Sequence, residues 1–119
     1  MKKLTLALAG AAVFALSSGA SAADLAAGKA AYEKFNCASC HGADGKTPTM
    51  ASYPIIAGQY ADYLAHALRS YKRGAAGAPA TANIRKNAIM GAMVAPLSEA
   101  DMQNIAAWLA SQPSGLATR

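Results

Sequence analysis

The stretch Cys37-Ala38-Ser39-Cys40-His41 holds both cysteines and one of the two histidines of this 119-residue chain. The spacing C-x-x-C-H is the attachment sequence of c-type haem, in which each thiol is joined to one haem vinyl group. The adjoining imidazole then projects toward the iron as an axial ligand. The stretch therefore predicts one covalently attached haem c, with Cys37 and Cys40 as its thioether links and His41 as an iron ligand.

Three other uses of these cysteines fit the sequence less well. A zinc site needs four ligands, and the adjacent Cys40 and His41 fit one tetrahedron poorly. A thioredoxin-like redox pair expects a βαβ setting, which a helical sequence does not offer. A disulfide between Cys37 and Cys40 would close a loop too small to stabilise the fold much.

Outward from the motif, the sequence favours an all-α fold with three main helices. Helix-forming residues dominate the periodic segments, and no convincing alternating apolar run is present. The first helix should begin after Asp24, a good N-cap residue, and end before Asn36. Its apolar stripe is Leu25, Gly28, Tyr32 and Phe35. Since glycine weakens a helix interior, Gly28 suggests either a close backbone approach or simple tolerance.

The other two helices lie in the second half of the chain. One should run from about residue 59 to 72, with Gly74 as its stop. The last should begin at Ser98, which forms a capping box with Asp101, and be closed by Pro113.

Two long connections, residues 42–58 and 74–83, separate these helices and are rich in Gly, Pro, Ala and Thr. Loops of this length in a small domain usually wrap something or carry a function. We therefore expect short helical turns and long loops wrapped around the haem.

The N-terminus has the pattern of a bacterial secretory signal. Two lysines precede an apolar run over residues 4–16, and Ala20-Ser21-Ala22 forms a small-residue cleavage site. The run is shorter than the roughly 20 residues of a bilayer-spanning helix, so we expect no stable membrane insertion. Residues 1–22 are predicted to be a cleaved signal peptide, and residues 23–119 an exported, soluble domain in the periplasm.

The charge of this domain is mildly basic. Removing residues 1–22 takes away two of 11 basic residues and none of six acidic ones, which leaves a net charge of +3. This balance suits transient electrostatic docking to an acidic protein patch. Nucleic acid is not expected as a partner, because the sequence has neither a basic stripe nor a binding motif.

The sixth ligand of a haem iron decides what such a protein does. A thioether ligand gives an electron carrier, whereas an open position gives a sensor or a catalyst. Met102 falls on the buried stripe of the last helix, and Met50 lies too soon after His41. Met90 and Met93 remain, in a flexible stretch before the last helix, although both are also suited to filling the core.

Two further features are open to more than one interpretation. His66 lies mid-helix on the side away from Leu64 and Leu68, so we expect it at the surface rather than at the iron. Five basic residues cluster between positions 69 and 86: Arg69, Lys72, Arg73, Arg85 and Lys86. They form a solvated face, a steering patch for an acidic redox partner, or counter-charges for the haem propionates.

Taken in order, these motifs make the chain resemble a class I c-type cytochrome, and most of all one half of the two-haem periplasmic cytochromes that feed terminal oxidases. The resemblance is carried by Gly28-Lys29-x-x-Tyr32, Cys37 to Gly42, Pro54-Ile55-Ile56-Ala57-Gly58-Gln59, Tyr63-Leu64, Met90-Gly91-Ala92-Met93, residues 97–101 and Ile105-Ala106-Ala107-Trp108.

The resemblance implies roles for individual residues. The axial methionine falls on Met90, with Met93 as a packing neighbour and the alternative ligand. The Pro54 carbonyl would accept a hydrogen bond from the proximal His41, which fixes the ring and tunes its basicity.

In the family fold the first and last helices cross with a glycine at the crossing. Gly28, Tyr32, Ile105 and Trp108 would form that contact here. The family more often has Tyr or Phe in place of Trp108, although the size of the indole still suits this role.

The function implied by the resemblance is outer-sphere electron transfer by a protein that is not an enzyme. Its partners would be a dehydrogenase donor and an oxidase or cytochrome acceptor. Two alternatives stay open: a haem subunit of a periplasmic dehydrogenase complex, and a ligand-binding or peroxidase-like haem protein with a labile methionine.

Overall fold

The computed structural model describes residues 22–115, all of whose regular structure is helical. The elements are α1 (Leu25–Lys34), α2 (Ala38–His41), α3 (Ala61–Ala75), the 3-10 turn η1 (Ala80–Ala82), α4 (Ala88–Val94) and α5 (Glu99–Ser111). The all-α prediction is confirmed for this part of the chain. The expected signal peptide falls almost entirely on residues 1–21, outside the described residues.

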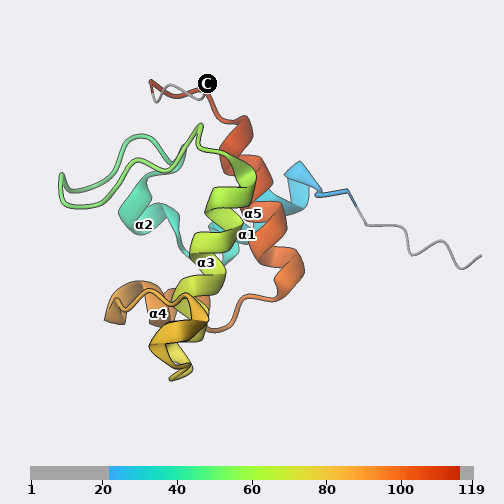
Figure 1. Ribbon diagram of the computed structural model, residues 1–119. Coiled ribbons are helices and arrows are strands. Elements are labelled where there is room, and N and C mark those ends of the chain that lie inside the picture. The colour runs from blue at the N-terminus through green and yellow to red at the C-terminus, as the bar shows by residue number, and fades with distance from the viewer. Residues whose placement is uncertain (1–21, 116–119) are drawn as a thin grey trace, which may run out of the picture.

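Three helix pairs make up the body of the fold. Helix α1 packs on α5, and α3 packs on both α5 and α4. In Figure 1, α3 runs through the centre with α5 beside it, α2 lies to the left of α3, and α4 lies near its lower end. No helix between residues 22 and 115 is long and apolar enough to span a bilayer.

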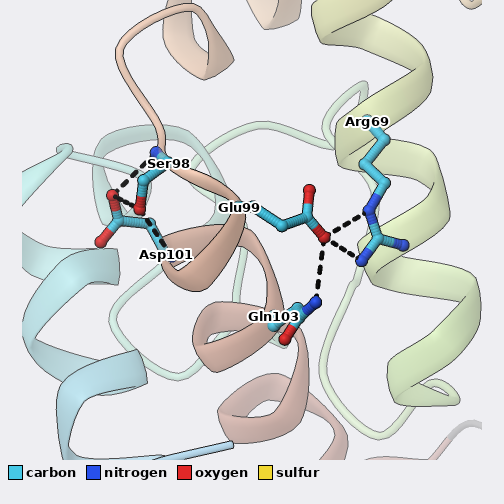
Figure 2. A network of polar contacts seen from close by, with 5 residues as sticks. All are labelled: Arg69, Ser98, Glu99, Asp101 and Gln103. Carbon is cyan, nitrogen blue, oxygen red and sulfur yellow. Dashed lines mark hydrogen bonds and ion pairs between the residues drawn. The ribbon is translucent and has the colours of Figure 1, made fainter. Parts of the chain in front are cut away.

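The two helices for which the sequence predicts an N-cap begin where it predicts. Asp24 accepts hydrogen bonds from the amides of Ala26 and Ala27 at the start of α1. At the start of α5, Ser98 and Asp101 form the reciprocal capping box, which Figure 2 shows from close by. These bonds satisfy amides that the first helical turn leaves without partners.

The crossing of α1 and α5 has the close contact that the resemblance implies. A Cβ on Gly28 would overlap the Asn104 carbonyl oxygen and lie 2.9 Å from Trp108 Cβ. Tyr32 is fully buried, and its ring centroid lies 4.8 Å from that of Trp108. The indole therefore takes the aromatic place at the crossing. Leu25 does not join the stripe: it is 48% exposed, because it lies in the first turn beyond the closest approach.

Gly74 does not end the helix that contains it. Helix α3 continues through Gly74 to Ala75, and the left-handed glycine that follows it is Gly77, at φ 77°. A Cβ on Gly74 would overlap the Arg85 carbonyl oxygen. The predicted stop was therefore wrong, because this glycine makes room for a neighbouring segment.

The stretch that carries Met90 and Met93 is helical rather than flexible. Helix α4 is capped by Asn87, whose side chain accepts a hydrogen bond from the Met90 amide. Val94 is 1% exposed in the core, and a Cβ on Gly91 would lie 3.1 Å from Ala75 Cβ on α3. Packing against α3 thus orders a segment that has no strong helix signal of its own.

Candidate haem site

The two cysteines lie at the ends of one short turn. Cys37 is the N-cap of α2, and Cys40 lies within this four-residue helix. Residues three apart in a helix share one face, so both thiols are presented on the same side. Both are free and half-buried, and burial raises the pKa of the Cys37 thiol.

His41 follows directly and is held by a carbonyl from the long loop. Its side chain is buried, and Nδ1 lies 3.0 Å from the carbonyl oxygen of Pro54. A carbonyl oxygen can only accept, so Nδ1 must carry the proton. In the neutral ring, Nε2 then keeps its lone pair and is the atom able to bind a metal.

The backbone after His41 is fixed from two directions. The buried Tyr32 hydroxyl donates to the Gly42 carbonyl oxygen at 2.8 Å, which ties this point to α1. Gly42 has a φ of 79°, and a Cβ there would overlap the Thr47 carbonyl oxygen. Further along, the Asp44 carboxylate accepts from the Lys46 and Thr47 amides, and these bonds hold its pKa below the usual value.

Tyr53 is a residue of the site that the sequence reasoning missed. Its ring centroid lies 6.4 Å from that of His41. A hydrogen bond to Cys40 raises the pKa of the Tyr53 hydroxyl. No motif marks this residue in the sequence, and only its place directly before Pro54, whose carbonyl oxygen contacts His41, connects it with the site.

The methionines occupy different environments. Met102 is 4% exposed in the core, as the sequence predicts, and Met50 is 57% exposed. Met90 and Met93 are both half-buried. Met90 packs against the same core cluster as Cys37. The choice of Met90 over Met93 as iron ligand stays a prediction.

His66 is exposed, as expected, and its Nε2 lies 2.8 Å from Asn83 Nδ2. The basic cluster is not a simple solvated face, because four of its five members have partners within the protein. Arg69 pairs with Glu99, which also accepts from Gln103 (Figure 2).

Of the other three paired cations, two lie on α3 and the third lies against it. The Lys72 ammonium donates to the Leu97 carbonyl oxygen, and Arg73 donates to the Asn83 carbonyl oxygen at 2.9 Å. Arg85 lies over two tyrosine rings. Lys86 is exposed.

The residues present fit a covalently bound haem. The α2 turn offers two thiols on one side, and His41 offers a buried imidazole with an available Nε2. Partly buried apolar side chains pack against the same core cluster as Cys37: Phe35, Ala38, Ile56, Leu68, Tyr71 and Met90. In residues 22–115, no group of three or more His, Cys, Asp or Glu side chains is placed to hold a metal ion such as zinc.

Comparison with known protein families gives a match over most of the chain. The family model described as "Cytochrome c" matches residues 25–113. This range contains the α2 motif, the His41–Pro54 contact and α4.

Individual relatives are similar over part of their length. "Cytochrome c4" of Stutzerimonas stutzeri is 42% identical over 77 residues, which cover 64% of this chain and 36% of that protein. The "Thiosulfate dehydrogenase electron acceptor" of Stutzerimonas stutzeri (strain A1501) is 36% identical over 118 residues, 96% of this chain and 50% of that protein. The chain thus spans half or less of these relatives.

A solved structure has the same arrangement of helices. The crystal structure of reduced recombinant cytochrome c4 from Pseudomonas stutzeri superposes with a TM-score of 0.69 at 36% sequence identity. The match covers 80% of this chain and 48% of the cytochrome c4 chain.

Proposed function

Because the chain belongs to the cytochrome c family, we propose that it is a periplasmic electron carrier with one haem c. Cys37 and Cys40 would hold the haem through thioether bonds, and His41 and Met90 would be the axial ligands. When bound, the haem supplies one-electron oxidation and reduction at its iron. The protein's own residues fix the ligands and surround the site with apolar side chains.

The observation that carries this proposal is the 3.0 Å contact between His41 Nδ1 and the Pro54 carbonyl oxygen. It fixes the tautomer and the ring orientation, so that Nε2 faces away from Pro54 with its lone pair available. Such a bond also makes the imidazole a stronger donor to a metal. A ligand held in this way keeps its geometry while the charge of the site changes by one electron.

Met90 is the second axial ligand in this proposal. Its amide is bonded to the Asn87 side chain, and its side chain lies against the core cluster that Cys37 also borders. A methionine bound on the second side would leave no open position for a substrate, which is why we propose a carrier rather than an enzyme.

The donor is proposed to be a periplasmic dehydrogenase. A relative of the same family is named a thiosulfate dehydrogenase electron acceptor. Contacts in electron transfer are typically small and short-lived. Rapid reduction of the purified ferric protein by such a dehydrogenase, without a complex that survives gel filtration, would support a free carrier. Stable co-elution would instead indicate a haem subunit of the enzyme.

Export completes the proposal, with residues 1–22 removed and residues 23–119 as the mature domain. Intact-mass measurement of the protein from the periplasm should give residues 23–119 plus one haem. A mass that retains the first 22 residues would contradict the proposed cleavage, since the Ala20-Ser21-Ala22 site would then be unused.

Replacement of the proposed ligand tests the function most directly. Met90→Ala should abolish the sulfur-to-iron absorption band of the ferric protein, because the thioether would be gone. It should also allow ready binding of cyanide or imidazole. Met93→Ala is the matched control and should keep the band.

Two results would contradict the proposal. Loss of the band only in Met93→Ala would make Met93 the ligand. Ready binding of carbon monoxide or cyanide to the unaltered protein would favour a ligand-binding haem protein.

A further inference from the structure

The segment that leads into α4 is fastened to one face of α3. Residues 83–87 connect η1 to α4, and Asn87 is the N-cap that accepts a hydrogen bond from the Met90 amide. A helix of seven residues has little stability by itself, so its position depends on tertiary contacts. The contacts of residues 83–87 therefore bear on where Met90 lies.

Contacts to its backbone hold this segment close to α3. The Arg85 amide donates to the Ser70 carbonyl oxygen at 3.0 Å. Arg73 donates to the Asn83 carbonyl oxygen at 2.9 Å. Gly74 leaves the space that the Arg85 carbonyl oxygen occupies, so the two backbones can touch.

The Arg85 side chain adds a contact that does not need a carboxylate. Its guanidinium carbon lies 5.5 Å from the Tyr63 ring centroid and 5.6 Å from that of Tyr71. It also donates to the Tyr63 hydroxyl at 3.2 Å. A planar guanidinium can lie against rings and donate in its own plane, whereas a lysine ammonium is a point charge on a flexible stem. Arg85 thus fastens the segment to two turns of α3.

We propose that Arg85, held between Tyr63 and Tyr71, is a positioning residue that keeps α4 and Met90 in place. The inference rests on the proposed function, in which Met90 is an axial ligand. Arg85 lies two residues before the N-cap Asn87, so releasing it frees the end of α4 that carries Met90. Its role is to restrict release of the methionine and to keep external ligands from the iron.

Imidazole binding to the ferric protein measures this restriction. An external ligand binds only when the methionine has left, so its apparent dissociation constant falls as the released state becomes more populated. Arg85→Ala should lower that constant about tenfold, as expected for the loss of two exposed cation–π contacts. Arg85→Lys should give an intermediate value, because it keeps the charge but not the planar group.

Lys86→Ala is the matched control, since it removes the same charge from the next residue, which is exposed. It should leave the imidazole constant within about twofold of the unaltered protein, the range of a neutral surface substitution. Equal imidazole affinities for Arg85→Ala, Lys86→Ala and the unaltered protein would overturn the inference. If Arg85→Ala does not fold with haem, the comparison of Arg85→Lys with Lys86→Ala decides in the same way.

A double substitution separates this inference from the proposed function. In a Met90→Ala background there is no methionine to release, so adding Arg85→Ala should not change imidazole affinity. A further tenfold gain there would overturn the positioning role, because Arg85 would then act without Met90. Persistence of the sulfur-to-iron band in Met90→Ala would instead overturn the ligand assignment in the proposed function.

Discussion

Gly28 shows how a single missing side chain determines a helix contact. Its position in the middle of α1 costs helix stability, yet a Cβ there would overlap the Asn104 carbonyl oxygen of α5. We expect Gly28→Ala to lower the free energy of unfolding by about 2 kcal/mol, because overpacking outweighs the gain of about 1 kcal/mol in helix propensity. Thermal and denaturant unfolding of the haem-loaded protein would measure the change.

The control for this substitution is Gly115→Ala, where nothing lies within 4 Å of an added Cβ. It should change stability by less than about 0.5 kcal/mol. If the Gly28→Ala protein were as stable as the control or more stable, the close approach of α1 and α5 would not be what requires a glycine at position 28.

Residues whose spacing is set by chemistry can be proposed from the sequence, and residues placed by the fold cannot. Cys37, Cys40 and His41 are recognisable because haem attachment demands that spacing. Tyr53 lacks such a pattern, because its place beside His41 and Cys40 depends on how the long loop returns to α2. The hydroxyl of Tyr32 likewise reaches Gly42 only through the packing of α1.

At the scale of elements, the longer helices with end signals were predictable, and the seven-residue α4, whose Asn87 cap is followed by only two turns of helix, was not. The cap at Asp24 and the capping box at Ser98 set the starts of α1 and α5 through bonds within one turn. Helix α4 is ordered by its packing on α3, and its sequence taken alone therefore suggested a flexible stretch. Gly74 was wrongly interpreted as a helix stop for a similar reason. The carbonyl group that requires a glycine there belongs to Arg85, outside the helix.

Gly74→Ala distinguishes the two explanations of that glycine. A glycine that merely weakens a helix end would be improved by alanine, with a gain of about 1 kcal/mol. We expect instead a loss of about 1–3 kcal/mol, because the methyl group would push the Arg85 carbonyl away from α3. Unfolding of Gly74→Ala beside Gly115→Ala provides the measurement, and a more stable Gly74→Ala protein would contradict the structural explanation.

At the scale of the whole molecule, the basic cluster divides into charges used within the fold and a charge available to a partner. Arg69 is paired with Glu99, and Lys72 and Arg73 donate to backbone carbonyl oxygens. These contacts tie α3 to α5 and to the 83–87 segment. Lys86 is exposed on that segment, directly before the N-cap of α4. The steering interpretation of the cluster therefore applies best to Lys86.

Charge reversal at Lys86 tests whether the molecule is steered toward an acidic partner. Lys86→Glu should slow reduction by the donor dehydrogenase about threefold at low ionic strength, because a favourable charge becomes a repulsive one. The difference should vanish as added salt shortens the screening length to a few ångströms. Stopped-flow reduction over a range of salt concentrations gives both quantities. The double variant Arg69→Gln/Glu99→Gln removes an ion pair without changing the net charge, so it should be reduced at the same rate as the unaltered protein. If Lys86→Glu were also reduced at that rate at low salt, docking would not use this face.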